Sequence, residues 1–133
     1  IAGPLDIPIG GNRTLIDAID RAGVPSPVQL MLAGHIHSFE ALNYGGAQRV
    51  PPQIIAGFGG DLLDHTPRVL GGAIFQGDSG ITVTHGVSIP GFGFVVLQRA
   101  ARGWDVAVHD VSGRLERRCW FRGGRVGCAP RHR

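Results

Sequence analysis

The chain is 133 residues long, with 43% hydrophobic residues, 22 Gly, 9 Pro and a formal net charge of +3 at pH 7. This length predicts about one domain with a sizeable core, and the high Gly and Pro content favours strands joined by turns over a helical bundle. No run approaches the roughly 18 apolar residues that cross a bilayer, so we expect no transmembrane segment.

The first predicted element is a short helix in the stretch TLIDAIDRAG, residues 14–23. Its apolar residues recur at helical spacing, and Gly23 followed by Pro25 is a typical helix end. We expect this helix to cover one face of a sheet. The chain opens on Ile1 in a Pro- and Gly-rich stretch, so we expect it to be a piece of a longer protein.

Two apolar runs follow, VQLMLA at 28–33 and PQIIAG at 52–57. Both are short and almost continuously apolar, which predicts strands buried on both faces. The residues between the two runs include the sequence GHIH at 34–37 and are predicted to form a loop. We expect one helix feeding a sheet, followed by several further strands.

Strand-like segments separated by Gly occupy the C-terminal part of the chain. They are 80–89, 91–100, 103–111 and 117–121, and we expect residues 81–133 to form terminal strands that end in a hairpin. Positions 99–133 hold nine Arg and three acidic residues, whereas positions 1–98 hold four Arg and seven acidic residues. Because the sequence offers no aromatic–basic platform or groove-reading helix beside these Arg, we interpret them as a solvated basic face and expect no specific nucleic-acid binding.

The hairpin is predicted in CWFRGGRVGC, residues 119–128, with Gly123 and Gly124 as a two-residue turn. Counting outward from the turn pairs Cys119 with Cys128 at a non-hydrogen-bonded position, where close Cα atoms suit a cross-strand disulfide. Two free structural thiols are the alternative. A disulfide implies an oxidising compartment, so we expect a periplasmic or secreted bacterial protein.

The sequence GHIH carries the clearest chemistry. In an extended segment, His35 and His37 point the same way and converge on one site. They follow a predicted buried strand, and α/β sheets place their sites at the carboxyl ends of strands. Gly34 allows a tight turn close to a metal, and neutral imidazole suits Zn, Fe and Mn. A closed site needs about four ligands, so this pair predicts a metal site only with ligands from elsewhere.

These residues resemble a known family. LAGHIHSFEAL at 32–42, followed by PPQIIAGFGGDLLD at 51–64, is similar to the last part of a calcineurin-like metallophosphoesterase, whose G-H-x-H motif follows a buried strand and whose next strand ends in a Gly-rich turn. Residues 92–121 resemble the C-terminal strands of exported bacterial members. The resemblance implies an α/β (α+β) fold, namely the C-terminal half of a metallophosphoesterase β-sandwich flanked by helices and mostly β in this chain.

The resemblance also implies a dinuclear centre, in which two Fe, Zn or Mn ions activate a bridging hydroxide for attack on a phosphate-ester substrate. Carried over to this sequence, His37 ligates the first ion and His35 the second. None of the family's D-x-H, G-D-x-x-D and G-N-H motifs precedes GHIH in this sequence, and the further metal-binding His that the family has ahead of the predicted helix is also absent. We therefore expect this chain to be the C-terminal portion of the domain, inactive alone, with the remaining ligands in an N-terminal half.

Five further residues are weaker candidates for contact with a metal ligand or the substrate: Gly34, Glu40, Asp61, Asp64 and His65. Glu40 is placed to hydrogen-bond a ligand histidine, and a surface carboxylate is the alternative. The other acidic residues and His65 follow the Gly-rich turn, where ordinary turn chemistry explains them equally well. For the whole chain, the competing hypothesis is a non-catalytic, secreted, β-rich binding module in which the histidines are incidental.

Overall fold

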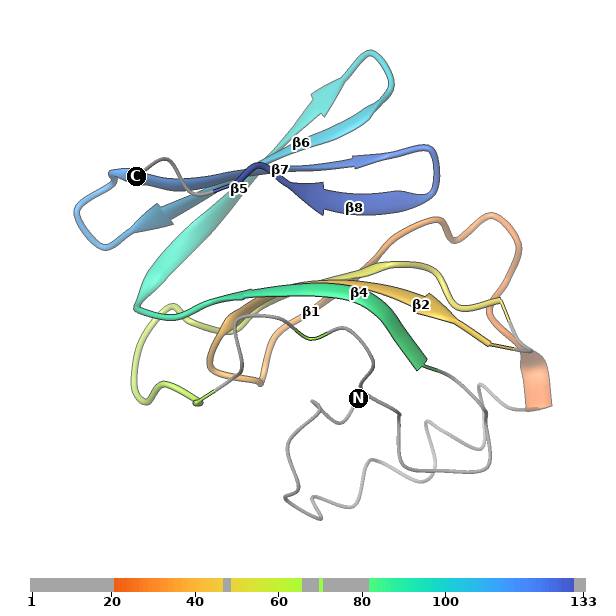
Figure 1. The fold of residues 1–133 in the computed structure, drawn as a ribbon, viewed down its shortest axis with the longest axis horizontal. Helices are drawn as coiled ribbons and strands as arrows, with labels where there is room; N and C mark the ends of the chain where they lie inside the picture. Colours follow the sequence, from red (N-terminus) through yellow and green to blue (C-terminus); the bar gives the residue numbers. More distant parts are fainter. Residues whose placement is uncertain (1–20, 47–48, 66–69, 71–81, 131–133) are drawn as a thin grey trace.

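Two four-stranded β-sheets stack face to face as a sandwich (Figure 1). The computed structural model describes residues 21–46, 49–65, 70 and 82–130. The strands are β1 (Met31–Ala33), β2 (Phe39–Gly45), β3 (Gln53–Ala56), β4 (Thr82–Ile89), β5 (Gly93–Ala100), β6 (Gly103–Asp110), β7 (Leu115–Arg122) and β8 (Arg125–Cys128). The first sheet contains β1 to β4 and the second contains β5 to β8, so the described part of the chain is mostly β, as the sequence predicts.

The first sheet has the strand order β1-β3-β2-β4. Its strands β1 and β3 are parallel, whereas β2 runs antiparallel to both β3 and β4. The expectation of a loop between the two apolar runs is therefore wrong for β2. The hydrophobicity pattern does not predict this strand, because the polar residues Glu40 and Asn43 occupy fully or almost fully buried positions in it.

The predicted burial of the first apolar run on both faces is also wrong. Strand β1 is an edge strand of the first sheet, and the side chain of its Leu32 is 63% exposed. The second run fits the prediction better, because Gln53, Ile54 and Ile55 of β3 are all buried. Strand β3 is flanked by β1 and β2, and both of its faces are packed: Ile54 lies in the core between the sheets, and Ile55 lies in a second apolar cluster on the opposite face.

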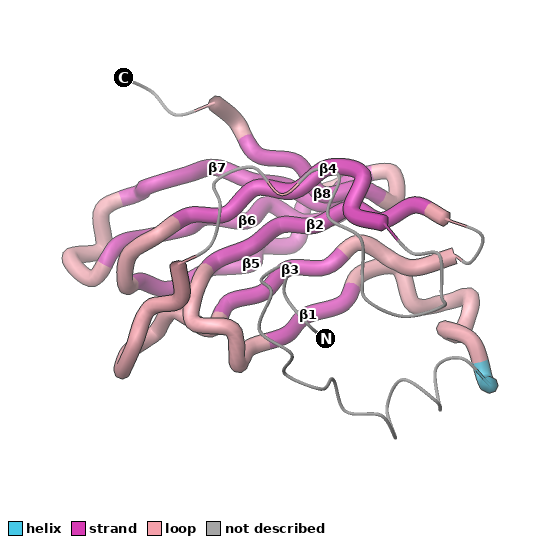
Figure 2. Tube along the Cα trace, turned by 60° about the horizontal axis from the view of Figure 1, so that its bottom comes forward, coloured by secondary structure: helices cyan, strands magenta, loops and turns pink. Residues whose placement is uncertain are grey.

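The second sheet is a simple antiparallel meander in the order β5-β6-β7-β8 (Figure 2). The segments predicted at 91–100, 103–111 and 117–121 are confirmed as β5, β6 and β7, and the segment at 80–89 is β4 of the first sheet. The predicted hairpin register is confirmed, with Cys119 opposite Cys128. These residues form the predicted disulfide, and their Cα atoms lie 3.9 Å apart.

The main core lies between the two sheets. Its buried members are Phe39, Ala41, Ile54, Phe58, Ile89, Val106, Val108, Cys119, Phe121 and Val126. The rings of Phe39 and Phe58 meet edge to face, with centroids 6.0 Å apart. Side chains alternate along a strand, so the residues of β2 next to Phe39 and Ala41 in sequence, Glu40 among them, point to the opposite face, away from the second sheet.

One buried polar residue also joins the sheets. The Asn43 side chain donates from Nδ2 to the Val126 carbonyl oxygen at 2.8 Å, and its Oδ1 accepts from the Val126 backbone N–H at 3.0 Å. Val126 sits at the second, non-hydrogen-bonded pair of the β7–β8 hairpin, so its backbone groups point away from β7. The Asn43 amide therefore pairs with the edge of β8 as a strand backbone would.

Of the helix predicted at 14–23, residues 14–20 lie outside the described residues. Arg21 and Ala22 are helical, and the chain turns at Gly23, which has a φ of 65°. In the part of the chain that is described, no helix is long and apolar enough to cross a membrane.

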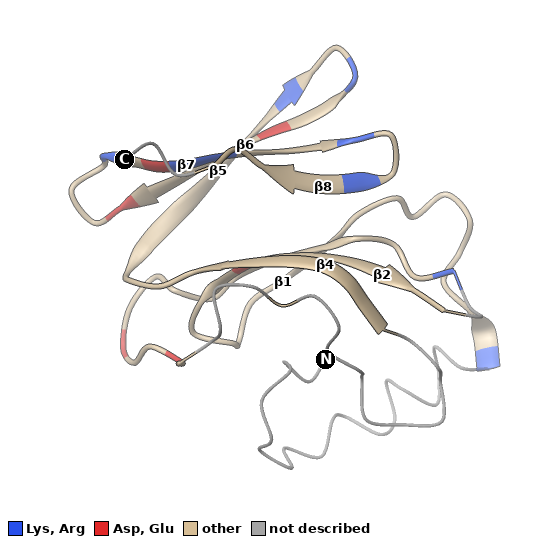
Figure 3. Ribbon diagram, in the orientation of Figure 1, with Lys and Arg blue, Asp and Glu red and all other residues tan. Residues whose placement is uncertain are grey.

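The charged residues are distributed unevenly between the two sheets. Figure 3 shows that most of the described Arg lie on the second sheet and its turns, whereas the strands of the first sheet carry none. Several of these Arg have acidic partners: Arg114 contacts Asp110 and Glu116, and Arg122 contacts Asp105. This pattern agrees with a solvated basic face.

Candidate functional site

The parallel pairing of β1 and β3 brings two loops to one edge of the first sheet. The sequence GHIH directly follows β1, and the sequence GFGG, residues 57–60, directly follows β3. Because the carboxyl ends of parallel strands meet at the same edge, both loops emerge side by side. This edge is where the sequence predicts a metal site.

Backbone contacts hold the two loops against each other. The Asp64 carboxylate accepts a hydrogen bond from the His37 backbone N–H at 2.7 Å, and the Asp64 N–H donates to the His37 carbonyl oxygen at 3.0 Å. The Gly57 N–H donates to the Ser38 carbonyl oxygen at 3.2 Å. A Cβ on Gly57 would lie 2.0 Å from the Ile36 carbonyl oxygen, so only glycine allows this approach.

Backbone strain is concentrated in the same two loops. Among the described residues, His35 (φ 77°) and Asp61 (φ 91°) are the non-glycine residues with positive φ. Such a conformation costs about 1–3 kcal/mol and is frequent at functional sites. Gly34, expected to provide the tight turn, has no positive φ, and a Cβ there would meet nothing within 4 Å. The expectation that Gly34 provides the tight turn is therefore wrong, because the positive φ is at His35.

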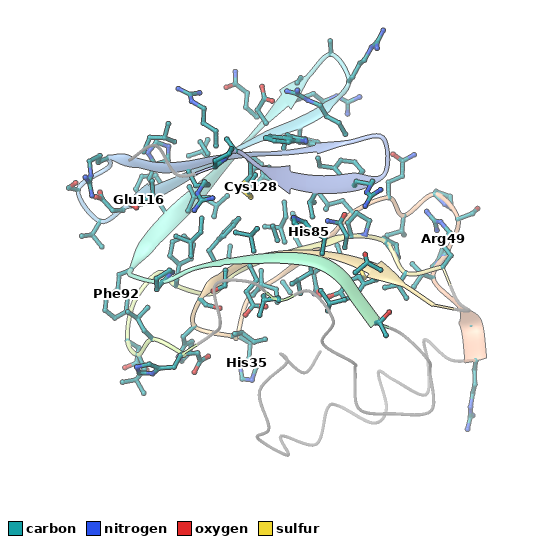
Figure 4. All side chains as sticks on the ribbon, in the orientation of Figure 1. His35, Arg49, His85, Phe92, Glu116 and Cys128 are labelled. Carbon is teal, nitrogen blue, oxygen red and sulfur yellow. A yellow bond between two sulfur atoms is a disulfide. The ribbon has the colours of Figure 1, made fainter. Side chains whose placement is uncertain are left out.

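The two histidines differ in exposure. His35 is exposed and His37 is half-buried. Figure 4 shows His35 on the side of the first sheet that faces away from the second sheet. Ile36, between them, packs against the buried residues Leu42 and Ile55 on that same side. The hydrophobic contact of Ile36 therefore anchors the loop and leaves the flanking imidazoles for other contacts.

Glu40 lies close to this loop but is not a surface carboxylate. Its side chain is 0% exposed, and the Ser38 hydroxyl donates to its Oε1 at 3.2 Å. Its Oε2 has no hydrogen-bond partner among the described residues. Burial raises the pKa of Glu40, the hydrogen bond from Ser38 opposes that shift, and the nearby charge of Asp64 adds to it. The alternative of a surface position for Glu40 is excluded by its burial.

The remaining predicted residues lie around the edge without forming a closed ligand set. Asp61, Asp64 and His65 are all exposed in the loop after β3. Within residues 21–46, 49–65, 70 and 82–130, no group of three or more His, Cys, Asp or Glu is arranged to hold a metal ion. At this edge the described residues offer two imidazoles, His35 and His37, and imidazole is a ligand type that suits Zn, Fe and Mn.

Gly57 and the loop-holding role of Asp64 are missed by reasoning from the sequence. The run GFGG signals a turn, but it does not reveal that Gly57 touches a loop some twenty residues earlier. The strands β1 and β3 must first be known to be parallel neighbours. No pattern within either loop contains that information.

Comparison with known proteins adds no relative to this picture. No protein-family model, no curated protein and no solved structure matches this chain. The candidate site is therefore defined by its own residues and geometry.

Proposed function

We propose that this chain is the C-terminal part of a dinuclear metal-dependent phosphoesterase. One observation carries the proposal: the loop with His35 and His37 and the loop after β3 meet at the carboxyl edge of a parallel strand pair. Each loop contains one non-glycine residue with positive φ. Such a conformation lowers the stability of the fold, and it occurs often at functional sites. The similarity of this segment to calcineurin-like metallophosphoesterases agrees with the proposal.

In this proposal, His37 and His35 each offer one imidazole nitrogen to a different ion of an Fe, Zn or Mn pair. Such a metal pair, if bound there, would supply Lewis-acid activation of the phosphate ester and of a water nucleophile. The chain itself contributes position. Asp64 fixes the His37 backbone, and Gly57 lets the loop after β3 approach Ile36. The loop that carries the two imidazoles therefore has a defined conformation before any ligand binds.

The isolated chain is proposed to be inactive. Two imidazoles supply one protein ligand for each ion, whereas a stable site needs about four. The missing N-terminal half is the proposed partner, because it would carry the D-x-H, G-D-x-x-D and G-N-H motifs. Strand β1 has its second edge unpaired among the described residues, which is consistent with further strands joining there.

The test uses the complete encoded protein. We expect hydrolysis of an aryl phosphate that a chelator abolishes and that added Zn²⁺ or Mn²⁺ restores. His37→Ala should lower this activity by at least about a hundredfold, and His85→Ala, an exposed strand histidine, should leave it unchanged. Absence of the three upstream motifs from the complete gene, or full activity of His37→Ala, would refute the proposal.

Localisation is part of the same proposal. Disulfides persist in oxidising compartments, and Cys119 and Cys128 are joined. We propose that the protein works in the periplasm or outside the cell. Two free thiols in protein isolated under non-reducing conditions would contradict this assignment.

A second candidate function is a secreted β-rich binding module. The outer face of the second sheet favours it, because Phe94 and Val96 are each 46% exposed there and Phe94 stacks on His109 with ring centroids 5.0 Å apart. Exposed apolar groups of this kind mark interaction surfaces when they are contiguous. The two functions separate on metal binding: a module with incidental histidines gives the same Co²⁺ affinity before and after His37→Ala.

A further inference from the structure

In the part of the chain that the structure describes, two buried polar atoms on one face of the first sheet lack hydrogen-bond partners. They are Oε2 of Glu40, an acceptor, and Nε2 of Gln53, a donor, and both side chains are 0% exposed. A buried polar group without a hydrogen bond destabilises the fold, so such groups are rare unless water or another ligand satisfies them. Because one of these atoms is an acceptor and the other a donor, a single bound molecule could satisfy both.

The pairing of β2 with β3 places the two groups near each other. Gln53 lies opposite Leu42, and Glu40 lies opposite Ile55, so Glu40 and Gln53 are diagonal neighbours on the same face. Diagonal neighbours in an antiparallel pair have Cα atoms about 7–8 Å apart, within reach of two long side chains. The surrounding Leu42 and Ile55 are buried and apolar, so nothing in their side chains satisfies either group.

Tyr44 ties the two groups together. Its hydroxyl donates to Gln53 Oε1 at 2.6 Å, which turns the Gln53 amide so that Nε2 is left over. Burial and, to a smaller extent, the charge of Glu40 raise the pKa of Tyr44, so the carboxylate and this hydroxyl interact electrostatically. The polar groups on this face therefore form one cluster rather than separate isolated groups.

We propose that one bound water joins Glu40 Oε2 to Gln53 Nε2 and completes a hydrogen-bond relay from Tyr44 to Ser38. Water is the chemical class that fits, because it donates to the carboxylate and accepts from the amide at once, and a buried water needs two to four such partners. The relay ends on the Ser38 hydroxyl, which donates to Glu40 Oε1. It therefore fixes the end of the GHIH loop from inside the sheet, whether or not that loop binds metal.

The loop contacts of Ser38 explain why this matters. The Ser38 N–H donates to the Ile36 carbonyl oxygen at 2.8 Å, and the Ser38 carbonyl oxygen accepts from Gly57 at 3.2 Å. The backbone of Ser38 therefore links both loops at the sheet edge, and the hydrogen bond to Glu40 holds the side chain of the same residue. Gln53 lies in β3, on a different strand from the GHIH loop and 15 residues after Ser38 in sequence. Through the proposed water it becomes a positioning residue for that loop.

The first experiment detects the water directly. In nuclear Overhauser spectra of the chain, the Gln53 side-chain amide protons should show a cross-peak to water with the sign of a long-lived complex. The exposed amide of Gln98 is the matched control and should show only the sign of rapidly exchanging water. Absence of the long-lived cross-peak at Gln53 would overturn the proposed water.

The second experiment tests the relay. Gln53→Leu should accelerate hydrogen exchange at the Ser38 amide by about tenfold, whereas Gln98→Leu should leave it unchanged. In a double-mutant cycle, Glu40→Leu and Gln53→Leu should be coupled by at least about threefold in the unfolding equilibrium constant, as expected for residues that share one network. Additive effects, or unchanged Ser38 exchange in a folded Gln53→Leu variant, would overturn the relay.

Discussion

Removing the Asn43 amide should weaken the contact between the two sheets. Asn43 and Val126 are 5% and 4% exposed, so water does not readily replace the two hydrogen bonds that join them. Asn43→Ala leaves the N–H and the carbonyl oxygen of Val126 without partners. At about 1–2 kcal/mol for each group, we expect a loss of roughly 2–4 kcal/mol in the free energy of unfolding. This is a large part of the roughly 5–15 kcal/mol that stabilises a typical domain.

An isosteric change separates the amide geometry from the loss of volume. Asn43→Asp keeps an acceptor for the Val126 N–H but turns a carboxylate oxygen toward the Val126 carbonyl oxygen. At neutral pH this variant should be at least as unstable as Asn43→Ala. Protonation of the introduced carboxyl at acid pH restores a donor, so the deficit relative to wild type should narrow as the pH falls.

The assay is urea unfolding of the oxidised chain, followed by tryptophan fluorescence at neutral and acid pH. Gln98→Glu makes the same amide-to-carboxylate change at an exposed position of the second sheet and should change the unfolding free energy by no more than about 0.5 kcal/mol. The reasoning is refuted if Asn43→Ala stays within about 0.5 kcal/mol of wild type, or if the Asn43→Asp deficit does not depend on pH.

Three further outcomes are expected. Gly57→Ala should cost about 2 kcal/mol or more, because its Cβ would lie 2.0 Å from a backbone carbonyl oxygen, while Gly59→Ala, with nothing within 4 Å, is the control; equal unfolding midpoints would contradict this. His35→Gly should stabilise the fold by about 1 kcal/mol in urea unfolding while weakening Co²⁺ binding, since glycine accepts a φ of 77° without strain; a loss of stability would contradict it. The pKa of Asp110 is lowered to about 2, first by the Ser112 hydroxyl, so its contribution to stability is complete above pH 3.8 and disappears as the pH falls through about 2; Ser112→Ala should raise that pKa in a carboxyl NMR titration, and an unchanged midpoint would show the cause is misassigned.

The second sheet was predictable because its signals are local. Gly123 and Gly124 set the turn, and the turn sets which residues face each other as far as Cys119 and Cys128. Each strand of this sheet also pairs with the next one along the chain. Periodicity and turn chemistry within a short window were therefore enough to locate these strands and the disulfide.

The first sheet was less predictable because its decisive contacts are remote. Strand β2 contains Glu40 and Asn43 at positions where a hydrophobic residue is expected. The Asn43 amide is satisfied by Val126 of β8, far along the chain, whereas the hydrogen bond of Glu40 comes from the neighbouring Ser38 and leaves one carboxylate oxygen over among the described residues. The pairing of β1 with β3 cannot be seen in either strand alone. His35 and His37 were found from their own motif, but the contacts that hold their loop depend on that pairing.

The contrast between local and remote pairing has a consequence for how the chain folds. Strands β5 to β8 are connected by residues 101–102, 111–114 and 123–124, so each pairing closes only a short loop. The first sheet must instead bring β4 beside β2 across residues 46–81, and it must insert β3 between β1 and β2. Short loop closures cost less entropy and precede long ones. We therefore expect the β5–β8 meander to form first and the first sheet to pack onto its apolar face afterwards. In pulse-labelled hydrogen exchange, amides of β6 and β7 should become protected before those of β1.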